Sequence, residues 1–293
     1  MNYKVSWWNL ENLLLPNTAK RSSKLKKRHK KTLKHWTEER YQQKLDNLAQ
    51  TIRQFHQHDG PDLLAIGEID SEAALHDLIK QLAKLDLHYH GHLASTSDPR
   101  RMHVGLLYRP NLFTIAQQES LFVPASKKTR DILNIQLQTE QGQRIHLLIN
   151  HWPSKRNNPA DRLKAAHCLK DALEHCTAPA LILGDFNTQP SDNLFNDLIT
   201  ESELHPLFNL PAEPTYFHHH PTGTTPISLD FAFISKEFTT SSTWQASMLF
   251  LEKQHQNELE RPQAFMRSNL KEFNEDGASD HFAISLTLEE KIN

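Results

Sequence analysis

Ala180-Leu181-Ile182-Leu183-Gly184-Asp185-Phe186-Asn187 is the stretch of sequence that decides the fold. It begins with four apolar residues in a row, a pattern typical of a strand that is buried on both faces of a sheet. The apolar run stops at Gly184, and a carboxylate and a carboxamide follow it closely. Because strand ends hold their side chains rigidly at the rim of a sheet, Asp185 and Asn187 are candidates for a functional site at such a rim.

Apolar or β-prone runs of the same kind recur along the chain, and helical patterns lie between them in the first two thirds. We expect strands at residues 3–8, 63–67, 103–108, 132–138, 144–151, 180–184, 229–234, 247–251 and 282–288. Apolar residues at three-to-four spacing predict helices over 38–55, 71–85 and 158–176, the first with Thr37 as its N-cap. This order favours an α/β fold in which two stacked sheets are flanked by helices.

Length and composition are compatible with one domain over residues 1–293. Hydrophobic residues make up 38% of the chain, which is enough for a single large core. The apolar stretches are far shorter than the roughly 18 residues of a membrane span, and the amino terminus lacks the apolar run of a signal peptide. The two cysteines, Cys168 and Cys176, are too few for a disulfide framework, so we expect reduced thiols and a cytoplasmic location.

The formal net charge of −2 conceals an uneven distribution of charge. Nine basic residues and no acidic residue lie between Lys20 and Lys34, whereas the rest of the chain has 24 basic residues against 35 acidic ones. Such a cationic segment on an acidic body indicates a polyanionic partner. We expect residues 16–36 to form a basic surface loop or arm, and residues 252–276 to form a second long excursion with a helical turn.

Polar side chains gather at the ends of the other predicted strands as well. Carboxylates and carboxamides with no thiol among them are the ligands of a hard cation such as Mg²⁺ or Mn²⁺, and neighbouring histidines add groups that transfer protons or contact phosphate. These groups suit the metal-assisted attack of water on a phosphate ester. Taken singly, an asparagine here is more typical of a turn, so the set is more specific than any member. The set comprises Asn9, Glu11, Glu68, Asn150, His151, Asp185, Asn187, Asp230, Asp280 and His281.

Six short motifs, in this order, resemble the endonuclease/exonuclease/phosphatase superfamily, and in particular its bacterial, deoxyribonuclease-like members. The motifs are Trp8-Asn9-Leu10-Glu11-Asn12-Leu13, Ile66-Gly67-Glu68, Asn150-His151-Trp152-Pro153-Ser154, Gly184-Asp185-Phe186-Asn187, Leu229-Asp230-Phe231 and Ser279-Asp280-His281. The resemblance covers nearly the whole chain, from Tyr3 to Leu288. It implies a four-layer α/β sandwich, which agrees with the order of strands and helices given above.

The resemblance also implies how a cation and a water molecule would be held. Asn9, Glu68 and Asp280 would help to bind an essential Mg²⁺, or Mn²⁺ in its place, with Glu68 as the principal carboxylate ligand. Asp185 would orient or deprotonate the attacking water. Asn187 would donate a hydrogen bond to the scissile phosphate.

Two histidines complete the implied catalytic set. His281 would contact the phosphate or act as a general base, and Asp230 would accept its other N–H and fix the tautomer. His151 would stabilise or protonate the leaving oxygen. Relatives usually have an acidic residue just before the strand at 104–108, which supports this second histidine. Here that neighbourhood is Arg100-Arg101-Met102-His103, so the support for His151 is missing from the sequence.

Basic residues are the candidates for substrate binding. Arg130 resembles a position that is often arginine in bacterial relatives, where it would contact phosphate, and an ion pair with Asp131 is the alternative.

Many relatives have an acidic loop where this chain has its basic segment. We expect that segment to contact nucleic-acid phosphates, while a solvated loop without a task and a surface for anionic lipid headgroups or inositol phosphates are the alternatives. Its candidate residues are Lys20, Arg21, Lys24, Lys26, Lys27 and Arg28.

The sequence therefore predicts a monomeric Mg²⁺-dependent phosphodiesterase, with nucleic acid as the leading substrate. A phosphatase and a phosphodiesterase for phospholipids or inositol phosphates are alternatives within the same fold. A catalytically silent protein that binds polyanions is the contrasting hypothesis. Such a protein would be expected to lack Glu68, Asp185 or His281, and all three are present.

Overall fold

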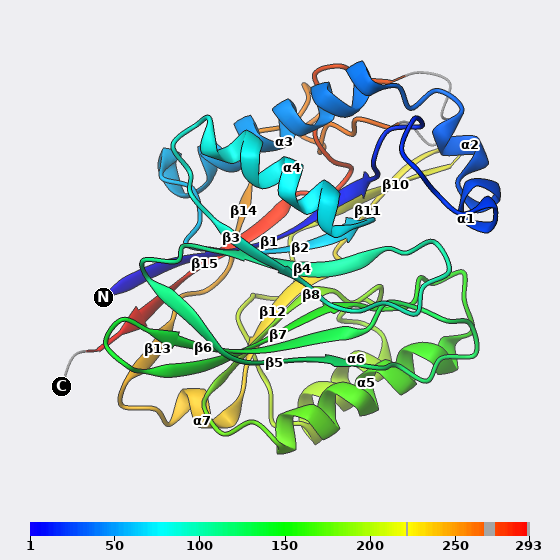
Figure 1. Ribbon diagram of the computed structural model, residues 1–293. Coiled ribbons are helices and arrows are strands. Elements are labelled where there is room, and N and C mark those ends of the chain that lie inside the picture. The colour runs from blue at the N-terminus through cyan, green and yellow to red at the C-terminus, as the bar shows by residue number, and fades with distance from the viewer. Residues whose placement is uncertain (221, 267–272, 292–293) are drawn as a thin grey trace.

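Two mixed β-sheets stack face to face in the computed structural model, and helices cover the outer face of each sheet (Figure 1). The structure describes residues 1–220, 222–266 and 273–291. Met1 and Glu290, which are hydrogen-bonded through their backbones, lie at one end of the sandwich (Figure 1). The expected four-layer α/β sandwich is confirmed.

The first sheet has the strand order β13-β15-β1-β2-β4-β3, and β14 also pairs with β15. Its central strand β1 runs parallel to β2 and antiparallel to β15. The strands are β1 (Asn2–Leu13), β2 (Leu63–Ile69), β3 (His90–Leu93), β4 (His103–Tyr108), β13 (Trp244–Ala246), β14 (Phe250–Glu252) and β15 (Ala283–Glu290).

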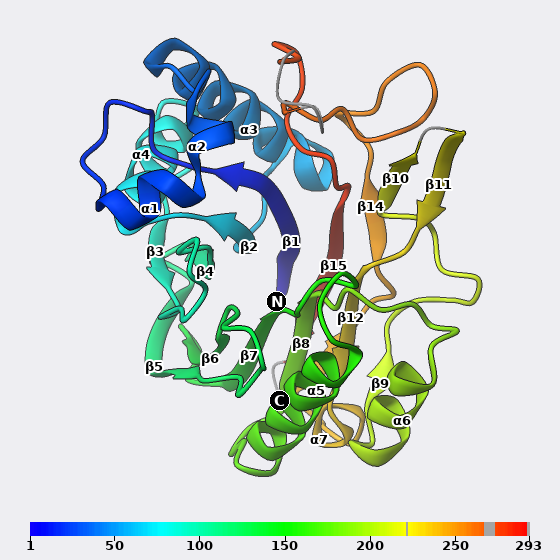
Figure 2. The ribbon, with the colours of Figure 1, turned by 90° about the vertical axis from the view of Figure 1, so that its right-hand side faces the viewer.

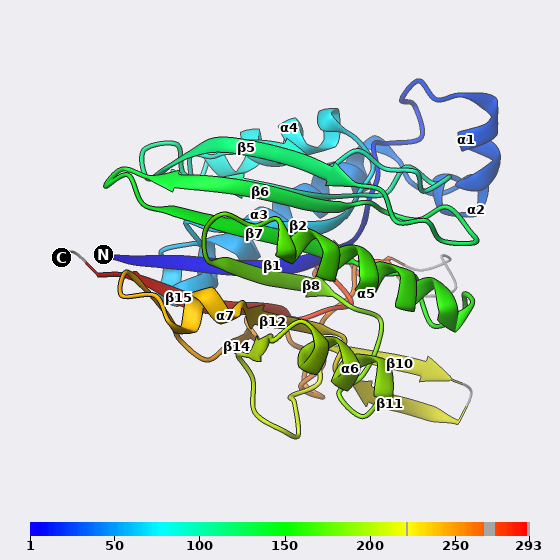
Figure 3. The same cartoon turned by 90° about the horizontal axis from the view of Figure 1, so that it is seen from below.

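The second sheet has the order β5-β6-β7-β8-β12-β9, with β7 parallel to β8 and β12 antiparallel to β8. A separate two-stranded hairpin, β10-β11, projects beside it (Figure 3). These strands are β5 (Phe113–Leu121), β6 (Ile132–Thr139), β7 (Arg144–His151), β8 (Ala180–Asp185), β9 (His205–Pro206), β10 (Tyr216–His220), β11 (Gly223–Ile227) and β12 (Asp230–Ile234).

The three predicted helices form, and each begins at a polar N-cap. The side chains of Thr37, Ser71 and Asn158 accept hydrogen bonds from the first turns of α3 (Glu38–His58), α4 (Glu72–Ala83) and α5 (Pro159–Glu174). α3 and α4 cover the first sheet, whereas α5 and α6 cover the second (Figures 1 and 3). The remaining helices are α1 (Ser23–Arg28), α2 (Lys30–Leu33), α6 (Asn193–Glu201) and α7 (Lys236–Thr239).

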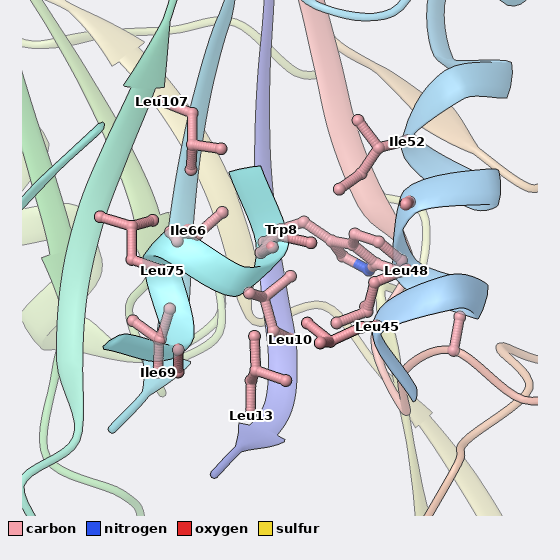
Figure 4. Packing of buried hydrophobic residues seen from close by; sticks show 14 of the residues in the cluster. Trp8, Leu10, Leu13, Leu45, Leu48, Ile52, Ile66, Ile69, Leu75 and Leu107 are labelled. Carbon is pink, nitrogen blue, oxygen red and sulfur yellow. The ribbon is translucent and has the colours of Figure 1, made fainter. Parts of the chain in front are cut away.

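The core has an inner layer between the sheets and two outer layers beneath the helices. Side chains alternate along each central strand, so Trp7 packs in the inner layer and Trp8 in the outer one. Leu181 and Ile182 of β8 divide in the same way between the inner layer and the layer beneath α5 and α6. Figure 4 shows the outer layer of the first sheet, where Trp8 of β1 meets helix α3. Both faces of the central strands are therefore buried, as their continuous apolar sequences predict.

Several elements differ from the sequence-based expectation. The strand expected at 247–251 is replaced by two three-residue strands, β13 and β14, that pair with opposite ends of β15. β3, β5, β9, β10, β11 and α6 were not anticipated, because their sequences lack a long apolar period. Residues 267–272 of the 252–276 excursion lie outside the described residues, so the helical turn expected there stays a prediction, and the described part contains turns and bridges.

The basic segment is also more regular than the expected loop. It folds into α1 and α2, and the side chain of Ser22 accepts a hydrogen bond from the backbone of Leu25 to start the first helix. Leu33 and Trp36 are buried in the outer layer of the first sheet. Tertiary contacts of these apolar residues explain a structure that the polar composition of the segment did not predict. Figure 2 shows the two short helices, α1 and α2, near the end of β1.

Gly184, which precedes Asp185 on β8, lies at a close approach of two strands. It has a φ of 150°, and a Cβ atom there would overlap the backbone carbonyl of Asn150 on β7. We expect Gly184→Ala to lower the free energy of unfolding by more than about 2 kcal/mol, since paired strands would have to separate. Urea denaturation measures this loss.

Gly223→Ala is the matched control, because Gly223 has a φ of 147° but no atom within 4 Å of its Cβ position. This variant carries the backbone strain without the overlap, so it should lose much less stability. Equal losses in the two variants would contradict the importance of the close approach between β7 and β8.

Candidate active site

The polar residues predicted from the strand ends meet at one edge of the sandwich. Two parallel pairs of strands, β1 with β2 and β7 with β8, contribute residues from their carboxyl ends. The strands that pair antiparallel with them, β15 and β12, contribute residues at their amino ends. Strand direction thus brings together side chains from nearly opposite ends of the sequence. Eight predicted residues line one pocket or contact those that do, namely Asn9, Glu68, His151, Asp185, Asn187, Asp230, Asp280 and His281.

His281 and Asp230 form a buried hydrogen-bonded pair. Nδ1 of His281 lies 2.8 Å from Oδ2 of Asp230, and Trp7 donates its indole N–H to Oδ1 of the same carboxylate at 2.7 Å. Burial by itself would lower the pKa of His281, but the negative charge and hydrogen bond of Asp230 raise it to about 10. The imidazole therefore carries a positive charge at neutral pH.

Further contacts hold both the backbone and the ring of His281. Ser279 donates its hydroxyl to the backbone oxygen of Asn9 at 2.6 Å and accepts a hydrogen bond from the backbone N–H of His281 at 3.2 Å. The ring of Tyr216 packs against the His281 ring with 4.8 Å between the centroids. Nε2 is left directed at the pocket, 4.0 Å from Oδ1 of Asp280.

Asp185 lies at the centre of the site. Its Oδ1 accepts the backbone N–H of Asn187 at 2.9 Å, and its Oδ2 lies 3.4 Å from Nε2 of His151 and 3.5 Å from Nδ2 of Asn9. Burial, together with the charge of Asp230, raises the pKa of Asp185 to about 7. Asn187 has a positive φ of 49°, and its side-chain amide donates to the backbone oxygen of Trp152 at 3.1 Å while it lines the pocket.

Oxygen ligands for a cation lie on the neighbouring side of the pocket. Glu68 interrupts the pairing of β2 with a positive φ of 63°, and its Oε2 accepts the backbone N–H of Asn12 at 3.0 Å. Such a backbone conformation is strained in a residue other than glycine and is typical of functional sites. Burial raises the pKa of Asp280, and the charge of Glu68 adds to the effect. Carboxylates that destabilise one another's charged forms, beside the carboxamide of Asn9, fit a hard cation.

A compact group of three potential metal-binding side chains is formed by Asp185, Asp230 and His281, whose ligand atoms lie within 4.8 Å of one another. Both oxygens of Asp230 already accept hydrogen bonds, from Trp7 and His281. Asp230 is therefore held by contacts within the protein and is positioned to orient His281.

His151 is a neutral histidine without a supporting carboxylate on Nδ1. That atom is buried and has no hydrogen-bond partner among the residues that the structure describes. Burial and the charges of Arg130, His281 and Arg100 lower the pKa of His151 well below its ordinary value. Its Nε2 lies 3.9 Å from Oε1 of Glu68, so it faces the carboxylates.

Arg130 forms part of the pocket wall and does not pair with Asp131. Its Nη1 lies 3.6 Å from Oδ2 of Asp98, and its Nη2 donates to the backbone oxygen of Trp152 at 2.8 Å. Asp131 instead accepts hydrogen bonds from Ser95 and Ser97. The expected alternative, an Arg130–Asp131 ion pair, is therefore wrong.

The pocket has a volume of about 1090 Å³ and combines an acidic floor with basic walls. Of the candidates from the basic segment, Arg28 lines it, whereas Lys20, Arg21, Lys24, Lys26 and Lys27 do not. Several other residues that line the pocket were not predicted from the sequence. Two pairs of basic residues, one shortly before Arg130 and one shortly after His151, were a signal that could have identified part of the basic wall. These residues include Arg100, Lys127, Lys128, Arg156, Tyr216 and His218.

A buried ion pair supports the site from beneath. Nζ of Lys44, on α3, lies 3.3 Å from Oε2 of Glu11 and donates to the backbone oxygen of Ala278 at 2.5 Å. The Glu11 carboxylate also accepts the backbone N–H groups of Phe265 and Met266. Burial raises the pKa of Glu11 and lowers that of Lys44, so each charge depends on the other. The pair links β1 and α3 to the segment that precedes Asp280 and His281.

Comparison with known proteins agrees with this fold. A sequence model of the endonuclease/exonuclease/phosphatase family matches residues 4–208. The chain therefore belongs to the endonuclease/exonuclease/phosphatase family. A search of curated proteins gave no match.

Solved structures of other members share the fold along the whole chain. A family protein from Bacteroides thetaiotaomicron is 16% identical, with a TM-score of 0.67 and coverage of 100% of this chain and 99% of that one. TDP2 from D. rerio, solved with a single-strand DNA product, is 14% identical, with a TM-score of 0.65 and coverage of 98% and 99%. A mannosyl-6-phosphatase from B. thetaiotaomicron is 15% identical, with a TM-score of 0.63 and the same coverage.

Lys44→Met should destabilise the protein by about 3 to 5 kcal/mol, because it removes one partner of a buried ion pair and leaves Glu11 without compensation. Gln50→Met is the matched control, since it introduces the same side chain at an exposed position of α3. Chemical denaturation compares the two variants with the wild type. A loss below about 1 kcal/mol in Lys44→Met would contradict the importance of this pair.

Proposed function

We propose that this protein is a Mg²⁺-dependent phosphodiesterase that acts on nucleic acid. The observation that carries the proposal is the arrangement of charge in the pocket. Carboxylates occupy the floor, a charged His281 stands among them, and cationic side chains form the walls. A divalent cation on the carboxylates and a phosphate between the cation and the walls would satisfy both sets of charges.

Asn9, Glu68 and Asp280 would hold the Mg²⁺ ion, with Mn²⁺ as an alternative. When bound, the ion supplies positive charge to the phosphoryl oxygens and lowers the pKa of water. The carboxylate and carboxamide oxygens of these three residues are the donors that such hard cations prefer.

The remaining residues would position the reacting groups. Asp185 would align the attacking water and accept its proton, since its Oδ2 faces the pocket between Asn9 and His151. His281 would donate a charged hydrogen bond from Nε2 to a phosphoryl oxygen, and Asp230 would hold the ring in that orientation. Asn187 would orient the phosphate from the opposite side.

The leaving oxygen would lie near His151 and Arg130. His151 is neutral and can donate from one ring nitrogen, while the guanidinium of Arg130 contributes positive charge from the wall.

We propose that the enzyme acts as a monomer in the cytoplasm, where its two free thiols stay reduced. No helix in the described part of the chain is long and apolar enough to cross a membrane.

Asp185→Asn and His281→Asn should each lower kcat for bis(4-nitrophenyl) phosphate at least about a hundredfold, as the loss of a positioned acid-base group does. Asp171→Asn is the control for a carboxylate change, because Asp171 is exposed on α5 outside the pocket. Steady-state rates in Mg²⁺ provide the measurement. Nearly unchanged hydrolysis by Asp185→Asn would contradict the role given to this carboxylate.

Removal of divalent metal should abolish hydrolysis, and Mg²⁺ or Mn²⁺ should restore it. The Glu68→Gln variant should need a higher metal concentration for half-maximal rate, because it keeps the shape of the ligand but loses its charge. EDTA treatment followed by metal titration tests both outcomes. Full activity in EDTA would exclude the proposed metal site.

A panel of substrates separates this proposal from its alternatives. Single-stranded and duplex DNA, RNA, abasic duplex, sphingomyelin, inositol phosphates and a hexose 6-phosphate should be assayed in parallel with Mg²⁺. Faster hydrolysis of a lipid, an inositol phosphate or the phosphosugar would replace nucleic acid as the substrate. Polyanion binding without turnover of any substrate would favour the silent binding protein.

A further inference from the structure

The basic segment, defined as residues 20–34, presents a dense group of exposed cations. Eight of its nine lysine and arginine side chains belong to exposed residues. Within the residues that the structure describes, none of these eight forms an ion pair. The exposed cations are Lys20, Lys24, Lys26, Lys27, Arg28, Lys30, Lys31 and Lys34.

The ninth cation, Arg21, anchors the segment to the body. Its guanidinium pairs with Asp70 at 3.1 Å, and the two side chains are only 3% and 5% exposed. The same guanidinium donates to the backbone oxygens of Leu15 and Pro16. Arg21 is therefore occupied within the protein and is unsuited to contact a substrate, contrary to the expectation from sequence.

Two further contacts fix the segment beside the pocket. The buried ring of His29 lies with Nε2 2.8 Å from the backbone oxygen of Arg100, a residue of the pocket wall. Trp36 is fully buried and donates its indole N–H to the backbone oxygen of Leu14 at 2.8 Å. Consequently α1 and α2 are docked at the end of the sandwich toward which β1 runs (Figures 1 and 3).

The cations of the segment continue the charge of the pocket outward. Arg28, the last residue of α1, lines the pocket together with Lys127 and Lys128 of another loop. Lys24 and Lys27 precede Arg28 on the same short helix, so a chain of phosphates leaving the pocket past Arg28 would meet further cations. A single small phosphodiester would not reach them.

We propose that the basic segment binds the sugar-phosphate backbone of a nucleic-acid strand on one side of the scissile phosphodiester. This inference rests on the proposed function and extends it, because it requires a substrate several nucleotides long. Counterion release would supply the binding free energy and would make the affinity strongly dependent on salt. The anchored segment would bind without the cost of first ordering a flexible arm.

A membrane surface fits the segment less well. The apolar side chains of Leu33 and Trp36 are turned into the core, and none of the exposed large hydrophobic residues in the described part of the chain lies in the segment. A helix that binds a bilayer needs an exposed apolar face beside its cations. The segment has the cations without that face, which favours a polyanion in solution.

The test measures binding separately from hydrolysis. A fluorescent single-stranded DNA of about 20 nucleotides, long enough to extend beyond the pocket, is titrated with the full-length Asp185→Asn protein in EDTA, and anisotropy gives the affinity at several salt concentrations. The triple variant Lys24→Gln/Lys27→Gln/Lys31→Gln should bind at least about tenfold more weakly at low salt. A plot of the logarithm of the association constant against the logarithm of the salt concentration should become less steep for this variant. Its slope should lose about 0.7 in magnitude for each phosphate of the single strand that the variant no longer neutralises.

Lys80→Gln/Lys84→Gln/Lys164→Gln is the matched control, because it removes three exposed cations from α4, its C-cap and α5, outside the pocket. It should bind almost as tightly as the parent. Equally weakened binding in both triple variants, or unchanged binding in both, would overturn the proposal. Thermal denaturation verifies that the triple variants are folded.

Two further outcomes separate this proposal from its neighbours. Binding of the wild type to phosphatidylserine vesicles through the same three lysines, with no binding of DNA or RNA, would overturn it in favour of a membrane surface. Salt-dependent binding of DNA through these lysines, with no hydrolysis of any substrate in Mg²⁺ or Mn²⁺, would refute the proposed function while supporting the binding surface.

Discussion

The burial of the two sheets against each other determines where every residue of the site lies. The inner layer is made almost entirely of alternate side chains from the central strands, such as Trp7, Leu147 and Leu183. Because each strand is locked in register by this packing, its first polar residue emerges at a defined point of the rim. Trp7 links the core to the site directly, since its ring packs in the inner layer and its indole N–H donates a hydrogen bond to the Asp230 carboxylate.

Electrostatic conflict is the second constraint on the site. Burial raises the pKa values of Asp185 and Asp280, and their neighbours' negative charges add to the effect. The negative charges of Asp230 and of the other carboxylates raise the pKa of His281 and so keep its ring charged. A protein would not maintain this arrangement for stability alone, because hydrophobic side chains of similar size would pack as well at lower cost. The arrangement is suited to binding a cation and an anionic phosphate side by side.

The supporting contacts extend well beyond the residues that would touch a substrate. Lys44 and Glu11 hold the segment before Asp280, while Asp98 pairs with both Arg100 and Arg130 in the wall. Asp98 neutralises these arginines rather than supporting His151, whose Nδ1 has no partner within the described part of the chain. The residues just before β4 therefore position two arginines of the pocket wall and leave His151 without a carboxylate on Nδ1 among the described residues.

The sequence by itself determined the class of fold, the three long helices with their caps, and the polar residues at the rim. These features depend on local patterns, namely continuous apolar runs, helical spacing and the residue that follows each run. The resemblance of short motifs then supplied candidate roles for Glu68, Asp185 and His281.

Only the tertiary structure decided which of these side chains share a pocket and which basic residues reach it. Arg21 and Arg28 are equivalent by composition, yet the first is buried against Asp70 and the second lines the pocket. In the sequence, Lys44 belongs to a polar stretch of a predicted helix. Neither this stretch nor the residues around Glu11 indicate that the two side chains form an ion pair. Burial and charge pairing depend on contacts between residues far apart in the chain, whereas a sequence pattern reports only on neighbours.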